Sequence, residues 1–137
     1  SASALGAEGR RFESCHPDVQ MYATPRFDVD RFASVGVVMD FLPAAGKGRN
    51  TRTHVVRIAA GGTLGEHEAT MRQVFAVVDG EAEISTDEGP RVPLPAGRFV
   101  VWETGELHQT WAVTDVVAVI VETDAALELP EHFRRLV

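Results

Sequence analysis

Short apolar segments separated by turn residues follow one another closely from residue 53 to residue 121. Residues 53–59 alternate with the two-residue period of a β-strand, and this predicted strand ends at Gly61 and Gly62. The other predicted strands are residues 72–78, 81–86, 92–94, 98–102, 107–113 and 116–121. Asp79-Gly80 is a typical hairpin dipeptide between two of them. Such a succession of short strands predicts an all-β sandwich or barrel.

The flanking segments carry weaker patterns. Residues 26–32 are predicted to form a short turn or strand, residues 42–50 a loop, and residues 35–41 an edge strand. Because an exposed strand edge needs cover, we expect residues 35–41 to pair across a two-fold axis in a homodimer. Pro130 beside Glu131 predicts a short C-terminal helix, with Phe133 and Leu136 facing the barrel.

Residues 1–20 show neither a helical nor a strand period and are rich in Ser, Ala and Gly. We expect this segment to be a disordered N-terminal extension, with Met21 as a reasonable native start. Residues 21–137 then form a single barrel domain, a length that is sufficient to bury a core.

Charge and composition narrow the classes of partner. The net charge of -7 argues against nucleic acid and against an anionic membrane surface, since both are bound through basic patches. No stretch has the length of a membrane span, and the N-terminus lacks the apolar core of a signal peptide, so a cytoplasmic protein is expected. Cys15 is the single cysteine, which excludes an internal disulfide and a cysteine-rich metal site.

Two runs, residues 61–80 and 95–111, each combine glycine-marked turns with a histidine, His67 in the first and His108 in the second. Together they resemble the two sequence motifs of the cupin family, the small jelly-roll β-barrels. The resemblance implies a jelly-roll, cupin-like β-barrel with an internal pocket and leaves the reaction open.

The first motif departs from that of metal-binding cupins. The resemblance implies two histidines two residues apart followed by a glutamate, with a third histidine in the second motif. Ala69 occupies the place of the second histidine, and Gln73 stands where the glutamate is expected. The remaining set, His67, Gln73 and His108, would hold one divalent ion (Fe, Mn, Ni or Zn) weakly, because all three ligands are neutral. Glu106 or Glu122 are alternative carboxylate donors.

Three functions are compatible with these residues. We favour a barrel that binds a small molecule, with a weak or optional metal. The alternatives are a metal-dependent oxygenase, or a metal-free isomerase or epimerase that uses His67 and His108 as acid and base, with Glu106 as a further catalytic candidate. The candidate ligand-binding residues are Gln73, Phe75, Trp102, Trp111 and Arg57.

Several of the candidate side chains also have a purely structural alternative. Large aromatic residues on strands usually pack in the core, which is the alternative for Phe75 and Trp102. Arg57 would clamp an acidic ligand or face solvent. His54 shares a strand face with apolar residues, which predicts either a structural, hydrogen-bonded histidine or a ligand.

Overall fold

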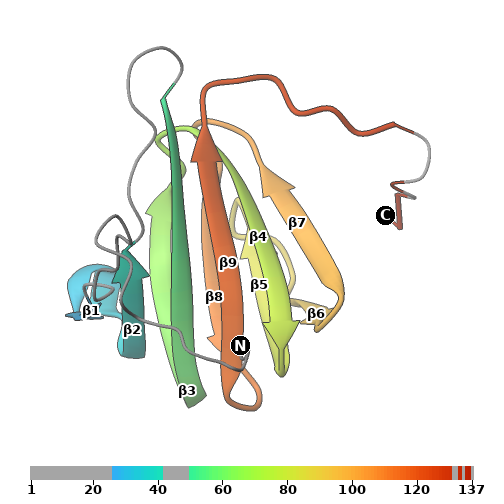
Figure 1. The fold of residues 1–137 in the computed structure, drawn as a ribbon. Helices are drawn as coiled ribbons and strands as arrows, with labels where there is room; N and C mark the ends of the chain where they lie inside the picture. The colour runs from blue at the N-terminus through green and yellow to red at the C-terminus, as the bar shows by residue number, and fades with distance from the viewer. Residues whose placement is uncertain (1–25, 42–49, 131–132, 134, 137) are drawn as a thin grey trace, which may run out of the picture.

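The computed structural model describes residues 26–41, 50–130, 133, 135 and 136. These residues form a nearly closed antiparallel β-barrel (Figure 1). Its elements are β1 (Arg26–Val29), the 3-10 turn η1 (Arg31–Ala33), β2 (Val35–Phe41), β3 (Thr51–Glu68), β4 (Arg72–Asp79), β5 (Glu81–Thr86), β6 (Val92–Pro95), β7 (Arg98–Trp102), β8 (Leu107–Ala112) and β9 (Val116–Thr123). Within the described part of the chain, no helix is long and apolar enough to cross a bilayer. The predicted N-terminal extension lies outside the described residues, as does nearly all of the predicted loop 42–50.

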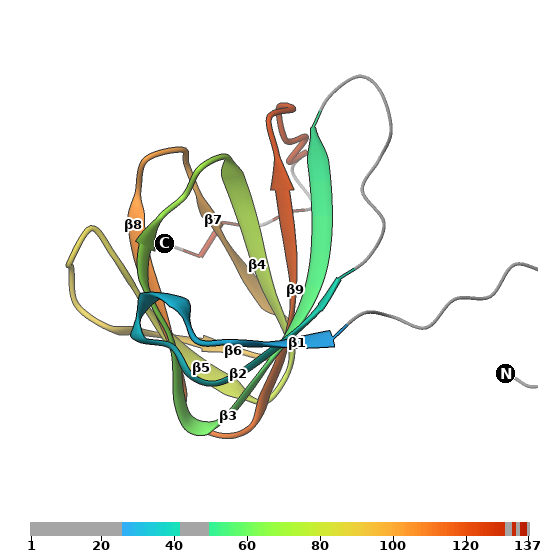
Figure 2. The same ribbon diagram turned by 90° about the vertical axis from the view of Figure 1, so that its left-hand side faces the viewer.

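β3 is the strand that joins the two sides of the barrel. The hydrogen-bonded order is β6-β5-β8-β3-β9-β4-β7, with β2 also paired to β3. Figure 2 shows β3 descending one side, turning at the bottom and rising on the other. The prediction that this strand ends at Gly61 and Gly62 was wrong. A Cβ on Gly62 would lie 2.3 Å from the carbonyl oxygen of Val35, so the glycines allow the strand to bend closely past its neighbour and continue.

A second irregularity lies further along β3. Leu64 pairs with Thr110 and His67 pairs with His108, so β3 holds one residue more than β8 over this interval. Such a β-bulge changes which face the following side chains occupy. Leu64 before the bulge and His67 after it both reach the interior pocket described below.

The Asp79-Gly80 turn connects opposite sides of the barrel. β4 pairs with β7 and β9, whereas β5 pairs with β6 and β8, so the predicted hairpin between β4 and β5 was wrong. Gly80 has φ +89°, and a Cβ there would lie 2.0 Å from the carbonyl oxygen of Asp115. The glycine therefore allows the turn to pack against the β8–β9 connection while the chain crosses from one side to the other.

The core consists of alternate residues of these strands. The predicted inward face of residues 53–59 is confirmed by Val56 and Ile58, which are almost fully buried. Other buried side chains are Leu64, Phe75, Val77, Ala82, Ile84, Leu94, Trp102, Val116, Ala118 and Ile120. Each large apolar side chain stabilises the barrel by about 1.5–3 kcal/mol on burial.

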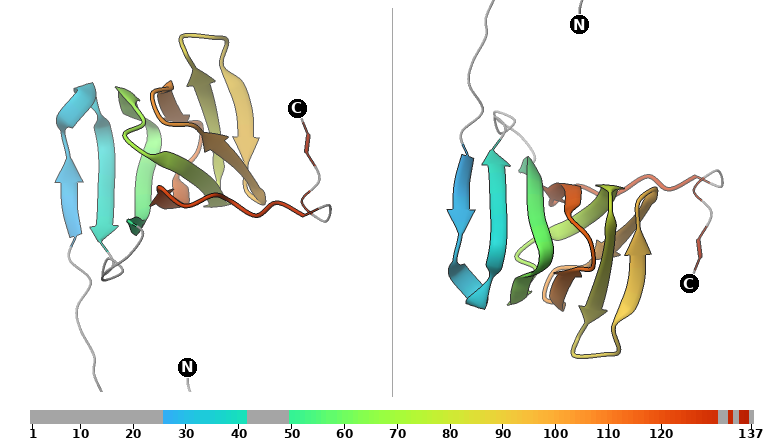
Figure 3. Two further views of the ribbon diagram at one scale, coloured as in Figure 1. Left: turned by 90° about the horizontal axis from the view of Figure 1, so that it is seen from above. Right: turned by 90° about the horizontal axis from the view of Figure 1, so that it is seen from below.

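β2 is an inner strand of the β1–β2–β3 ribbon, seen beside the barrel in Figure 3. It was predicted to be an edge, but β1 covers it. Asp40 of β2 forms ion pairs with Arg26 of β1 at 2.6 Å and Arg57 of β3 at 3.4 Å. The hydrogen bond from Arg26 is the main cause that lowers the pKa of Asp40. The homodimer stays a prediction, but its two-fold pairing cannot use the edge of β2.

The predicted C-terminal helix was wrong for the residues described. After β9 the chain leaves the barrel, and between residues 125 and 136 the described residues include no helix (Figure 1). The Phe133 N–H donates to the Pro130 carbonyl at 2.8 Å, which closes a single turn. Phe133 and Leu136 are 44% and 51% exposed, so little apolar burial is available to offset the cost of nucleating a helix.

Candidate binding pocket

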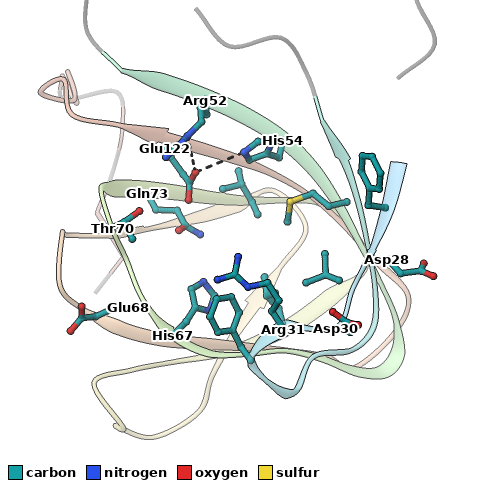
Figure 4. A pocket seen from close by; sticks show the side chains of 16 residues that line it. Asp28, Asp30, Arg31, Arg52, His54, His67, Glu68, Thr70, Gln73 and Glu122 are labelled. Carbon is teal, nitrogen blue, oxygen red and sulfur yellow. Dashed lines mark ion pairs between the residues drawn. The ribbon is translucent and has the colours of Figure 1, made fainter. Parts of the chain in front are cut away.

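A pocket of about 820 Å³ opens between the η1 side of the barrel and the strands behind it (Figure 4). Residues of β1 and η1 form one wall, and the opposite wall comes from β3, β4 and β9. Apolar atoms contribute more of its surface than polar atoms, but most of its lining residues are polar or charged, and two groups of them lie at separate places. His67 marks one of these places, and Gln73 with Glu122 and His54 marks the other.

His67 and His108 lie side by side across the β3–β8 ladder. Their ring centroids are 4.4 Å apart, with 60° between the ring planes. His67 Nδ1 lies 2.7 Å from the carbonyl oxygen of Gly65, and His108 Nδ1 lies 3.2 Å from that of Glu106. Since a carbonyl oxygen only accepts, we assign the proton of each ring to Nδ1.

His108 is the deeper of the two histidines. It is 2% exposed and does not line the pocket, whereas His67 does. Burial is the main cause that lowers the pKa of His108 to about 4, so its ring is neutral at pH 7. Its Nε2 is buried and makes no hydrogen bond with any described residue. The Nε2 of His108 is thus a hydrogen-bond acceptor without a partner among the described residues, on a ring that contacts His67.

Two of the aromatic candidates form a layer beneath the histidines. Trp102 stacks on His108 with centroids 4.2 Å apart, and its Nε1–H donates to Thr86 Oγ1 at 2.7 Å. Phe75 is also buried and packs against Trp102, with the ring centroids 5.8 Å apart. Neither Phe75 nor Trp102 lines the pocket, so both support the site as core residues.

The second polar place is built on the β4–β9 and β3–β9 ladders. Gln73 pairs with Glu122, and His54 pairs with Ile120. Glu122 Oε1 lies 3.8 Å from His54 Nε2, and also 3.5 Å from Arg52 Nε (Figure 4). Burial lowers the pKa of His54, and the charge of Glu122 partly opposes that shift. The neutral form of His54 is therefore favoured at pH 7.

Three predicted site residues lie elsewhere. Arg57 pairs with Asp40 outside the pocket. Trp111 lies under the guanidinium of Arg91, whose Cζ is 3.9 Å from the ring centroid. The carboxylate of Glu106 accepts a hydrogen bond from the Glu103 backbone N–H at 2.7 Å, so it stabilises a turn.

Two residues that line the pocket, Glu122 and Arg31, were not among the predicted ligand-binding residues. Glu122 follows Val116, Ala118 and Ile120 in strict alternation, and this period was the signal that its carboxylate faces inward. Arg31 was missed because it lies in a turn, where no period indicates the direction of a side chain.

The donor set for a metal ion is short. In the described residues, no group of three His, Cys, Asp or Glu side chains is arranged to hold an ion. His67 and His108 provide two imidazoles, whereas catalytic sites usually have three protein ligands. The third imidazole is missing because Ala69 occupies the position of the second histidine of the first motif, and this buried side chain carries no ligating atom.

The described residues form a jelly-roll barrel with a pocket on one side. Residues 54–124, more than half of the chain, match the cupin domain family. The chain belongs to the cupin family, as its two motifs indicated. A comparison with curated protein sequences finds no match.

Solved structures share the barrel at low sequence identity. An RmlC-like cupin from Shewanella frigidimarina is 20% identical, with TM-score 0.61 over 74% of this chain and 85% of that one. KdgF from a Halomonas species is 19% identical, with TM-score 0.60 over 74% and 89%. The polyketide cyclase RemF from Streptomyces resistomycificus is 14% identical, with TM-score 0.64 over 80% of each chain. At these identities the likeness concerns the fold.

Proposed function

We propose that this protein binds a small organic molecule in the barrel pocket. The observation that carries the proposal is the pocket itself, about 820 Å³ in volume, whose surface combines apolar side chains with several polar and charged ones. Sites for small organic ligands commonly have this size. His67 at one place and Gln73 at the other are suited to orient a ligand by hydrogen bonds.

Acid–base catalysis without a metal is the second candidate function. His54 beside Glu122 provides a proton acceptor whose neutral form is favoured by burial, and His67 lies on the same pocket. Such a pair supports isomerisation or epimerisation of a bound molecule. Among structures with this fold, one is described as a polyketide cyclase and another as a predicted oxalate decarboxylase, so the barrel is compatible with several reactions.

A divalent metal remains an optional addition to this proposal. His67 and His108, whose rings are in contact, are the side chains that would hold an ion, and the Gln73 amide oxygen would have to reach them from the other polar place. Such an ion would supply a Lewis acid or a redox centre. Because the donor set contains two imidazoles and no carboxylate, we propose weak binding and route no step of the function through a metal.

The experiment is a fragment screen by ligand-observed NMR, followed by titration of each hit into variants. Gln73→Leu removes the Gln73 amide from the pocket at similar side-chain volume. Gln109→Leu is the matched control, because Gln109 lies outside the pocket lining and donates a hydrogen bond to Thr63 on β3. We expect hits whose affinity falls about tenfold, or ~1.4 kcal/mol, in Gln73→Leu only. A screen without hits, or hits that both variants bind like the wild type, would contradict the proposal.

A further inference from the structure

We propose that the ligand of this pocket is a carboxylic acid with an apolar body, and that Arg31 binds its carboxylate. This inference rests on the proposed function and specifies the chemical class of the ligand. It concerns a side chain that neither sequence motif contains.

Arg31 is a cation of the pocket that forms no ion pair within the described part of the chain. Arg52, the other arginine in the lining, forms an ion pair with Glu122. Arg31 makes no ion pair or hydrogen bond through its guanidinium with any described residue, and its Cζ lies 4.8 Å from the ring centroid of Phe32. Figure 4 shows its guanidinium directed into the pocket, between His67 and the opposite wall. A guanidinium with five free donors is well matched to a carboxylate.

The acidic side chains of the lining do not neutralise Arg31. Figure 4 shows the carboxylates of Asp28 and Glu68 pointing away from the pocket, and both residues are exposed. Asp30 is exposed too, and forms no ion pair with Arg31. The charge of Glu122 is offset by Arg52 and lies at the other polar place. The guanidinium of Arg31 thus has no ion-pair partner among the described residues and is free to bind an anion.

The turn that carries Arg31 has a defined backbone conformation. Phe32 and Ala33 both have positive φ, 59° and 55°, a conformation that costs non-glycine residues roughly 1–2 kcal/mol each. The strained turn is stabilised by the stacking of Phe32 on His67, with centroids 4.5 Å apart. It is also held by the Gly65 N–H, which donates to Ser34 Oγ at 2.9 Å. The point at which Arg31 enters the pocket is thus set by the backbone, and its guanidinium lies over the ring of Phe32.

The rest of the lining favours an organic acid over an inorganic anion. Val29, Met39, Leu64 and Ile120 are apolar members of the same lining as Arg31. A single unpaired cation balances one carboxylate, whereas a phosphate dianion needs further positive partners. The volume of about 820 Å³ also exceeds what a small ion fills. The carboxylate would thus bind at Arg31 with its carbon skeleton on the apolar side chains.

The test compares acids with their own amides. Isothermal titration of the wild-type chain with 4-phenylbutyrate and 4-phenylbutyramide, and with further acid–amide pairs of aryl and alkyl chains, isolates the charge from the shape. We expect the acids to bind at least about tenfold more tightly than the amides. Arg31→Gln should abolish this preference and Arg31→Lys should restore part of it. Arg98→Gln, an exposed arginine of β7 outside the lining, should leave it unchanged.

The outcomes separate the inference from the proposed function. Equal affinity for acid and amide in the wild type would overturn the inference while leaving ligand binding intact, as would an acid preference that persists in Arg31→Gln. Absence of binding by every acid and every amide would overturn both. Inorganic phosphate is a third ligand to titrate, and if it displaces the acid at equal concentration, the apolar body is not recognised and the inference fails. The wild-type comparison does not depend on the folding of any variant.

Discussion

The indole of Trp102 lies nearly parallel to the imidazole of His108, with 18° between the ring planes and 4.2 Å between the centroids. This contact covers one face of His108, and the edge of the His67 ring approaches it as well. Little room is left for water around His108, so the ring is kept in its neutral form.

We expect His108 to make folding sensitive to acid. Its pKa is lowered from 6.5 to about 4 in the folded state, so the unfolded state binds the proton first. Stability should therefore fall as the pH drops from about 6.5 to about 4, by at most about 3 kcal/mol. Urea unfolding at pH 7 and pH 5, with a chelator present, should show a smaller loss for His108→Gln than for the wild type. An equal loss in both proteins would contradict this assignment.

Thr86→Val should destabilise the barrel by about 1–3 kcal/mol, because the Trp102 Nε1–H loses its acceptor at nearly constant side-chain volume. Urea unfolding followed by tryptophan fluorescence measures both the stability and the environment of the indole. Thr51→Val is the control, since its hydroxyl bonds to Thr123 and is remote in sequence from either tryptophan. Similar changes in emission for the two variants would argue against the Thr86–Trp102 bond.

Gly65→Ala should displace the η1 turn from the pocket. A Cβ at Gly65 would lie 1.5 Å from the carbonyl oxygen of Phe32, so one of the two backbones must move. We expect a loss of stability of about 1–3 kcal/mol and the loss of the Phe32–His67 stacking, visible as altered His67 resonances in NMR. Gly61→Ala is the comparison, because Gly61 has φ +83° and open space, which isolates backbone strain from collision. Unchanged His67 resonances in Gly65→Ala would exclude this displacement.

Metal binding by the two histidines should be weak. With two imidazoles and one amide oxygen as donors, we expect Zn²⁺ or Ni²⁺ to titrate reversibly and to be removed by mild chelation. Elemental analysis of the wild type beside His67→Ala and His108→Ala measures this. A stoichiometric ion that survives extensive dialysis against chelator would show that further ligands exist.

The homodimer is tested by size-exclusion chromatography with light scattering. Since β2 is paired on both sides, the exposed ladder edge that remains on this ribbon belongs to β1. We therefore expect Phe27→Lys, on β1, to weaken the dimer, and Val113→Lys, on an exposed position distant in the chain, to leave it unchanged. A monomer at micromolar concentration in the wild type would refute the dimer.

The strands of the barrel could be predicted because burial on one face imposes a two-residue period. That period extends through β4, β5, β8 and β9, where buried and less buried residues alternate. The path between strands could not be predicted in the same way. At Gly62 and at Gly80 the local sequence is that of a turn, but the course of the chain there depends on Val35 and Asp115, which are remote in sequence.

Only part of the candidate site could be predicted, because contacts between strands are not visible in a single sequence. His67 and Gln73 were recognised from motif and spacing, and both line the pocket. Trp111 and Arg57 were weighed as ligand contacts, but each has a surface partner from another strand, Arg91 and Asp40. Such partners are a property of strand pairing, which a single sequence does not display.

The bulge in β3 determines which face of the strand the side chains after Leu64 occupy. His54 and His67 are separated by an odd number of positions, so an uninterrupted strand would turn one of them inward and the other outward. The additional residue between Leu64 and His67 cancels that mismatch. If the strand paired without the bulge at its present length, His67 would point to the outside of the barrel, whereas deletion of the additional residue would restore an even separation and keep His67 inside. The bulge thus allows His54 and His67, which lie at the two polar places, to face the same pocket.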